Sequence, residues 1–194
     1  MKCRRFIFLL LVLPAAAVSA ADSQDNFALK GAGFLPCQVF VTEREKKSNI
    51  YYMIGGWLEG FISAHNKYVD DTYDITSFES LELLLWVIDN HCKSHPEDRL
   101  YSVVNSILIQ LSPDRLQKRS PKVEIKSGQR TTVLYEETIR RVQARLAALG
   151  LYKGAADGHY SEATKSALMA FQSDKNLEMT GFPDQTTLWR LLRQ

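Results

Sequence analysis

Apolar residues recur every three or four positions in three stretches of the first two thirds of the chain, and this spacing predicts amphipathic helices. The first helix is expected over residues 48–69. The second is expected to begin near residues 76–79, where Thr76 precedes Glu79 in the pattern of a capping box. The third follows the break at Pro96 and extends to about Leu111. The positions predicted to face a core include Ile50, Ile54, Trp57, Phe61, Leu81, Leu84, Leu85, Ile88, Leu100, Val103, Val104, Ile107 and Leu108.

The same periodicity returns near the C-terminus and predicts three shorter helices. One is expected over residues 135–149, and Gly150 suits the left-handed residue that follows a helix. A second is expected over residues 162–175, with Ser161 as its N-cap. The last contains Leu188, Trp189, Leu191 and Leu192.

A polar and basic stretch separates these two groups of helices. Pro113 ends the first group, and residues 112–131 contain Pro121 and Gly128. Residues 123–126 alternate between apolar and polar, which is compatible with a brief strand but is too short a pattern to predict one. The fold class expected is therefore all-α, with two small helical domains at residues 33–111 and 132–194 joined by a basic linker at residues 112–131.

The N-terminus has the pattern of a secretory signal peptide. Basic residues precede an apolar run over residues 6–17, and Val18-Ser19-Ala20 supplies small residues for cleavage. The run is shorter than the ~20 residues that a membrane-spanning helix needs. We expect residues 1–20 to be removed, with cleavage after Ala21 as the alternative. The predicted location of the mature protein is the periplasm, with no integral membrane segment.

Removal of residues 1–20 leaves two cysteines, Cys37 and Cys92. In an exported chain such a pair favours a disulfide over a metal site or a nucleophile. A staple of this kind is useful to a domain of under ~100 residues, which buries a small fraction of its surface.

Charge is unevenly distributed along the mature chain. Residues 21–111 hold 7 basic and 13 acidic residues, residues 112–131 hold 6 and 2, and residues 132–194 hold 8 and 7. An exported chain with this balance is not expected to bind nucleic acid. The basic stretch fits either a solvated linker or a contact with an anionic surface.

A short sequence recurs within the C-terminal part. Residues 157–164, DGHYSEAT, return as residues 180–187, TGFPDQTT. In both copies a glycine is followed six residues later by a threonine, and an apolar helical stretch comes next. The repeat predicts a small module built from two copies of one turn.

These turns and the flanking helices resemble the small peptidoglycan-binding domain attached to many bacterial cell-wall hydrolases. The resemblance implies a three-helix fold that holds wall glycopeptide without catalysis. The chain departs from the usual family pattern at Val142, Ser161 and Thr180, where leucine, glycine and aspartate are common. The matching residues are residues 142–146, 149–152 and 157–160 with Thr164, Ala167, Phe171, Gln172, Gly181 and Thr187.

Most of this motif is expected to be structural, because short polar side chains and glycines satisfy and shape tight turns. Aromatic residues around the turns are expected to be exposed, and their flat faces suit a sugar-peptide ligand. Arg145 suits a stem-peptide carboxylate, although its position on a helix face favours a solvated arginine. The residues predicted to bind peptidoglycan are Arg145, Tyr152, Asp157, His159, Tyr160 and Phe182.

Residues 33–111 resemble more loosely a group of small exported helical proteins that includes the acid-stress chaperone HdeA and the Tai-type immunity proteins. The resemblance implies an all-α fold closed by Cys37 and Cys92. Families of this shape differ in function, so it does not assign one. The shared residues are Cys37, residues 57–61, His65, Asn66, Asp74, Ile75, Thr76, Trp86, Cys92, His95 and Pro96.

Catalytic and metal-binding hypotheses find weaker support in the same domain. His91 and His95 are spaced as metal ligands can be, but a disulfide would occupy Cys92. Glu59 could act as an acid in wall hydrolysis, although that chemistry needs a second placed carboxylate. No catalytic residue, metal or cofactor is therefore predicted.

The sequence thus favours an exported, non-catalytic peptidoglycan-binding protein whose N-terminal domain binds a protein partner. Two alternatives stay open. The N-terminal domain could inhibit a wall-degrading enzyme, as an immunity protein does, or the chain could be a peptidoglycan hydrolase with an unrecognised active site.

Overall fold

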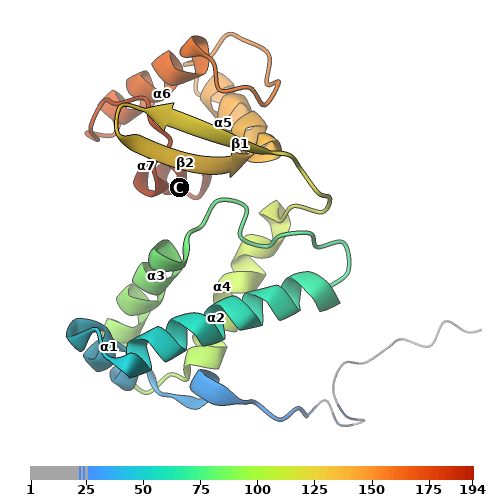
Figure 1. Ribbon diagram of the computed structural model, residues 1–194, viewed down its shortest axis with the longest axis vertical. Helices are drawn as coiled ribbons and strands as arrows, with labels where there is room; N and C mark the ends of the chain where they lie inside the picture. Colours follow the sequence, from blue (N-terminus) through green and yellow to red (C-terminus); the bar gives the residue numbers. More distant parts are fainter. Residues whose placement is uncertain (1–21, 23, 25) are drawn as a thin grey trace, which may run out of the picture. The chain divides into compact units, whose positions relative to one another are not determined.

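The apolar stripes of the first half of the chain pack as helices around one core (Figure 1). The computed structural model describes residues 22, 24 and 26–194, so the expected signal peptide at residues 1–20 lies outside the described residues. Residues 31–194 form one compact unit. No helix among the described residues is long and apolar enough to cross a membrane. The first elements are η1 (Gly31–Phe34), α1 (Cys37–Lys46), α2 (Asn49–Tyr68), α3 (Leu81–Ser94), α4 (Leu100–Leu111) and η2 (Ser112–Asp114).

Helix α1 is attached to the other helices by covalent and backbone bonds. Cys37 and Cys92 form the predicted disulfide, which joins the start of α1 to α3. The Cys37 amide donates to the Asp98 carbonyl at 2.8 Å, and the Gln38 amide donates to the Pro96 carbonyl at 2.9 Å. The apolar positions of α1 follow no regular stripe, which is why its sequence pattern did not predict a helix.

Breaking the disulfide should destabilise this part of the chain strongly. The two cysteines are 55 residues apart, and closing such a loop contributes about 4 kcal/mol in the chain-entropy model. We expect the Cys37→Ala/Cys92→Ala double variant to lose roughly 2–4 kcal/mol of unfolding free energy in urea titrations. The oxidised and reduced wild-type protein should differ by a similar amount, whereas the double variant should not respond to reductant. A loss below about 1 kcal/mol would contradict this role.

Helix α3 begins later than the sequence pattern suggested. Its N-cap is Ser80, whose hydroxyl accepts from the Leu83 amide at 3.2 Å. The prediction of a helix start at Thr76 is therefore wrong. The hydroxyl of Thr76 instead donates to Asp74 at 3.0 Å, and the side chains of Phe78 and Glu79 are buried. Residues 76–80 do not join the helix because several of them contact the C-terminal part of the chain instead.

A two-stranded sheet occupies much of the segment expected to be a linker. Strands β1 (Lys122–Ser127) and β2 (Arg130–Tyr135) are antiparallel, and Gly128 at φ 59° lies in the two-residue turn between them. Ile125 and Leu134 point into the core of the C-terminal part. The fold is mostly helical, as predicted, and this hairpin is the departure from all-α.

The C-terminal part packs three helices and the hairpin around a second core (Figure 1). The helices are α5 (Glu136–Ala148), α6 (Glu162–Asp174) and α7 (Gln185–Leu192), close to the predicted ranges. Phe78 belongs to this core although it precedes α3 in the sequence. The two predicted domains therefore share a packed interface, and their boundaries at residues 111 and 132 stay a prediction.

Polar contacts reinforce that interface. The Thr138 hydroxyl, on α5, donates to the Ser77 carbonyl at 3.0 Å. The Tyr135 hydroxyl donates to Asp74 at 2.9 Å, and burial together with this carboxylate raises the pKa of Tyr135 far above its ordinary value. Arg193 contacts Glu79 at 2.7 Å, with the Glu79 side chain fully buried. The loop over residues 70–80 is thus held on the C-terminal module by several side chains.

Candidate functional site

The first repeated turn is organised by a buried glutamine of α5. The Gln143 side-chain oxygen accepts from the Gly158 amide at 2.8 Å. Its amide nitrogen donates to the His159 carbonyl at 2.9 Å and to the Thr164 hydroxyl at 3.1 Å. Gln143 and Thr164 have no exposed surface. The Gln143 side chain therefore satisfies the Gly158 amide and the His159 carbonyl, in a turn that has no regular secondary structure.

The second turn repeats this arrangement with Gln172 of α6. Its oxygen accepts from the Gly181 amide at 2.7 Å, and its nitrogen donates to the Phe182 carbonyl and the Thr187 hydroxyl, each at 3.0 Å. The repeat found in the sequence is therefore a repeat of Gln–Gly–Thr frames. The repeat of the turns does not by itself reveal that Gln143 and Gln172 have the same role. The two glutamines are offset by 29 residues, whereas the turns are offset by 23.

Two residues predicted to touch the ligand are part of the module core instead. Tyr152 is 8% exposed and Phe182 is 5% exposed. The prediction that both present exposed ring faces is wrong. The Tyr152 hydroxyl donates to the Ala155 carbonyl at 3.1 Å, and both rings pack in the cluster that contains Leu146 and Phe171. Burial of apolar ring surface explains their position.

Tyr160 links the two turns. Its hydroxyl donates to the Gly181 carbonyl at 2.6 Å, and it is half-buried. Burial, with a smaller contribution from Glu162, raises the pKa of Tyr160 to about 12. The hydroxyl therefore stays protonated near neutral pH and keeps donating this bond.

Asp157, His159 and Arg145 are the predicted site residues that face solvent. The His159 amide and the Gln143 side-chain amide donate to the Asp157 carboxylate at 2.9 Å and 3.0 Å, and these bonds lower the pKa of Asp157. The His159 side chain is 78% exposed and lies beside that carboxylate. Arg145 donates to the Leu191 carbonyl at 3.3 Å, which ties α5 to α7. The structure thus leaves an exposed imidazole and an exposed carboxylate together at the first turn.

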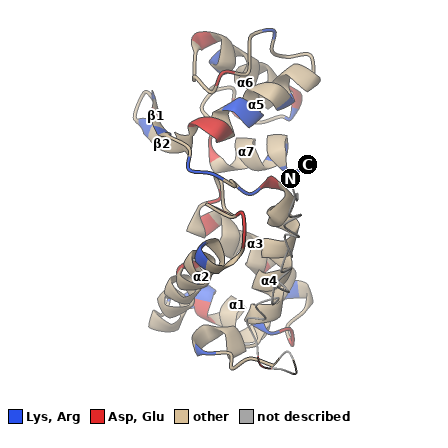
Figure 2. Ribbon diagram, turned by 90° about the vertical axis from the view of Figure 1, so that its right-hand side faces the viewer, with Lys and Arg blue, Asp and Glu red and all other residues tan. Residues whose placement is uncertain are grey.

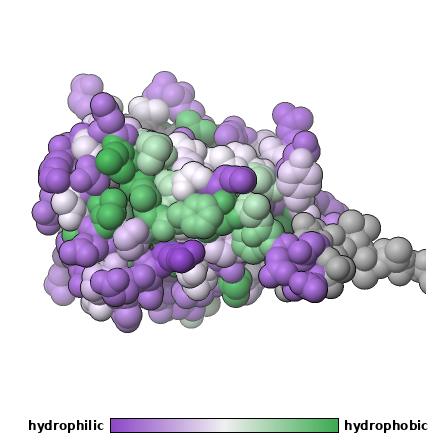
Figure 3. All heavy atoms as spheres, turned by 90° about the horizontal axis from the view of Figure 1, so that it is seen from below, coloured by the Kyte–Doolittle hydropathy of each residue, from purple (hydrophilic) through white to green (hydrophobic). Residues whose placement is uncertain are grey.

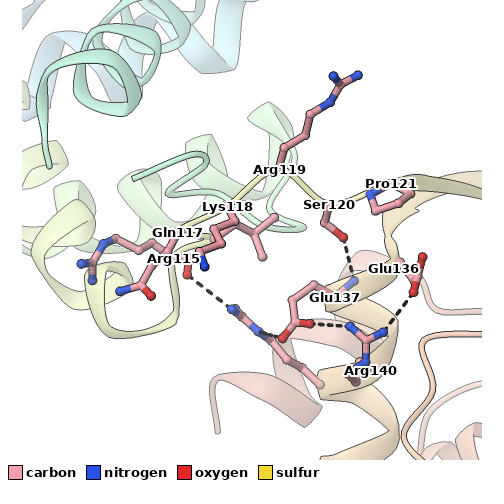
Figure 4. Close-up of a pocket in the computed structure, with 11 residues that line it drawn as sticks. Arg115, Gln117, Lys118, Arg119, Ser120, Pro121, Glu136, Glu137 and Arg140 are labelled. Atoms are coloured by element: carbon pink, nitrogen blue, oxygen red, sulfur yellow. Dashed lines mark hydrogen bonds and ion pairs between the residues drawn. The ribbon is translucent and has the colours of Figure 1, made fainter. Parts of the chain in front are cut away.

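A polar pocket of about 460 Å³ lies between residues 115–121 and the start of α5 (Figure 4). Figure 2 shows the acidic and basic residues gathered at the first turns of α5. The Arg140 side chain donates to Glu136 at 3.0 Å, Glu137 at 2.7 Å and the Asp157 carbonyl at 3.2 Å. Arg141 donates to Glu137 and to the Asp114 and Arg115 carbonyls.

These contacts decide how the polar pocket can act. The guanidinium groups of Arg140 and Arg141 already donate to carboxylate and carbonyl groups of the protein. Figure 4 shows the Arg119 side chain directed away from the pocket. Anion binding would have to compete with Glu136 and Glu137. The pocket is therefore better suited to fixing the connection on α5 than to capturing a ligand.

His91, Cys92 and His95, which were candidates for metal binding, have structural partners. His91 pairs with Asp98 at 2.8 Å and stacks on His95, while Cys92 is in the disulfide. Among the described residues, no group of three or more His, Cys, Asp and Glu side chains is placed to hold a metal ion. Glu59 is exposed on α2.

The paired frames give the C-terminal part a compact helical scaffold with exposed residues at its first turn. Residues 135–191 match the model of the peptidoglycan binding domain family. The C-terminal part of the chain is therefore a peptidoglycan-binding domain, in agreement with the resemblance seen in the sequence.

The chain is also similar to a curated protein, the N-acetylmuramoyl-L-alanine amidase CwlM of Mycobacterium tuberculosis, with 40% identity over 55 residues. That match covers 28% of this chain and 14% of the relative's length. No solved structure matches the chain. The likeness of residues 33–111 to HdeA and the Tai-type proteins stays a prediction.

Proposed function

We propose that this is an exported, non-catalytic protein that binds peptidoglycan through residues 132–194. The observation that carries the proposal is the pair of Gln–Gly–Thr frames inside a region that matches the peptidoglycan binding domain family. The disulfide supports a location outside the cytoplasm, where such bonds persist. The periplasm is the compartment that we propose.

The exposed position of Glu59 supports the non-catalytic part of the proposal. A general acid in glycoside hydrolysis needs a carboxyl group shielded from water and a second carboxylate across the scissile bond. Glu59 is exposed on α2. The amidase activity in the name of the relative belongs to that protein, of which this chain matches a small part.

Binding to the wall can be measured directly on the mature chain. Residues 21–194 should co-sediment with purified sacculi in a saturable way, and digestion of the sacculi with a muramidase should release the protein. Cellulose of the same mass is the control for trapping in a pellet. A chain that stays in the supernatant with intact sacculi would refute the function.

The intact mature chain is the right material, because residues 132–194 alone would lack Phe78 and Ile125, which belong to the module core. Incubation with sacculi should release no soluble fragments. If it does, loss of release in the Glu59→Gln variant would favour the hydrolase alternative.

Exposed apolar residues on the N-terminal helices support a second proposal, that this domain has a protein partner. Figure 3 shows a band of apolar side chains bordered by polar ones on one face of the molecule. Exposed apolar residues of η1 and α2 include Phe34 at 50%, Ile50 at 42% and Met53 at 51% exposure. Exposed apolar patches bordered by polar residues are typical of interaction sites. We propose that this domain binds a wall-associated protein, and inhibition of a wall-degrading enzyme is one form that such binding can take.

A further inference from the structure

A groove between α3 and α7 has features that neither core explains. Its volume is about 430 Å³, and both the helical domain and the peptidoglycan-binding domain line it. The lining residues central to its chemistry are Ser80, Trp86, Gln185, Thr186, Trp189 and Arg190.

The two tryptophans are the most informative of these residues. Trp86 is 47% exposed, and Trp189 is half-buried. Neither belongs to the core clusters that hold the helices together. Tryptophan carries a large apolar surface and is highly buried on average. Two that line one groove without packing in a core therefore indicate a surface built to bind something.

The groove is held in shape by the contacts between its walls. The Gln185 side chain donates to the Phe78 carbonyl at 2.8 Å and accepts from the Ser80 amide at 2.9 Å. Ser80 caps α3, and Asp184 caps α7 through the Thr187 amide at 2.8 Å. Both helices that carry a groove tryptophan thus start from fixed points, so a ligand meets a site that is already formed.

The groove is lined by charges of both signs, Arg44, Glu82 and the exposed Arg190, and this mixture favours an uncharged ligand over an anion or a cation. Arg44 is already paired with Asp89 at 2.7 Å and with Glu82 at 3.4 Å. The Glu82 side chain is 72% exposed and would repel an acidic stem peptide. The hydroxyl and amide side chains of Ser80, Thr186 and Gln185 add neutral hydrogen-bonding groups. Indole faces beside such groups complement a sugar, which has apolar ring faces and hydroxyl edges.

We propose that the α3–α7 groove binds the N-acetylated glycan strand of peptidoglycan, with Trp86 and Trp189 stacking on sugar rings. The inference rests on the proposed function and adds the ligand class and the place of contact. It also gives the N-terminal domain a part in wall binding, because Trp86 and Ser80 come from that domain.

The three tryptophans of the chain allow a direct test in solution. The ¹H–¹⁵N spectrum of the mature chain, labelled at the indole nitrogens, should show one signal each for Trp57, Trp86 and Trp189. Titration with a neutral N-acetylglucosamine tetramer should shift the signals of Trp86 and Trp189. The Trp57 signal should stay in place, since that ring packs on Phe61 outside the groove.

Tetramer binding by tryptophan variants tests whether the groove is the binding site. Trp86→Ala and Trp189→Ala should each weaken tetramer binding about tenfold, with unchanged far-UV circular dichroism. Tyr52→Ala, on the exposed surface of α2, is the matched aromatic control and should bind as the wild type does.

The possible outcomes distinguish failure of the glycan site from failure of the proposed function. Sacculi that bind while the tetramer shifts neither groove tryptophan would overturn the glycan site and leave the proposed function standing. Shifts of the same signals by a stem peptide but not by the tetramer would also overturn it, in favour of peptide recognition. Failure to bind sacculi would count against the function itself.

Discussion

Replacing Arg193 with methionine should cost about 3–5 kcal/mol of unfolding free energy, the range found when a buried ion pair loses one partner. The Arg193 side chain is 10% exposed and contacts the fully buried Glu79 carboxylate at 2.7 Å and 2.9 Å through two nitrogens. It also lies over the Phe78 ring and pairs with Asp114. Methionine keeps much of the packing but leaves a buried negative charge with only the Phe78 amide as a partner and no cation beside it.

A double variant distinguishes the charge from the packing. Replacing Glu79 with glutamine removes the uncompensated charge and keeps a side chain of similar shape, so Glu79→Gln/Arg193→Met should recover most of the lost stability. Arg190→Met, on the exposed face of α7, is the matched control and should change stability by less than about 0.5 kcal/mol.

Urea unfolding followed by tryptophan fluorescence measures all three variants. Trp86 and Trp189 lie on either side of the interface, so they report its loss. A cost below about 1 kcal/mol for Arg193→Met would show that the contact between the helical domain and the module contributes little to the fold.

The sequence predicted the elements whose signal is local. Residues 48–69 carry both a regular apolar stripe and a serine at the N-cap, and α2 begins after Ser48, whose hydroxyl accepts from the Tyr51 amide. Helices α5 and α6 follow the predicted ranges for the same reason. Periodicity and capping depend on neighbours in the chain, so they can be read without the tertiary structure.

The predictions that failed depend on distant contacts. The capping pattern at Thr76 was overridden because Phe78 belongs to the other core, which also contains Ile139 and Leu188. Tyr152 and Phe182 were expected at the surface because they flank turns, yet the turns fold back over the core of α5 and α6. The α3–α7 groove brings together Ser80 and Gln185, which are 105 residues apart. No spacing rule connects such residues.

The repeated turns give the most sensitive test of the module scaffold. We expect Gly158→Ala and Gly181→Ala each to destabilise the protein by roughly 2–5 kcal/mol, from a left-handed backbone and a steric clash combined. Gly158 has φ 82° and Gly181 has φ 69°. A Cβ atom would lie 2.9 Å from the Glu136 carbonyl oxygen in the first turn and 2.9 Å from the Lys165 carbonyl oxygen in the second.

Gly150→Ala is the matched control, because it separates the two causes. Gly150 has φ 76°, but an added Cβ would meet no atom within 4 Å. It should therefore lose only the backbone contribution, about 1–2 kcal/mol. Urea titrations of the three variants should place Gly150→Ala well above the other two in stability. Equal losses in all three would mean that the carbonyl contacts yield easily, and the turns would then be less rigid frames than the buried glutamines Gln143 and Gln172 indicate.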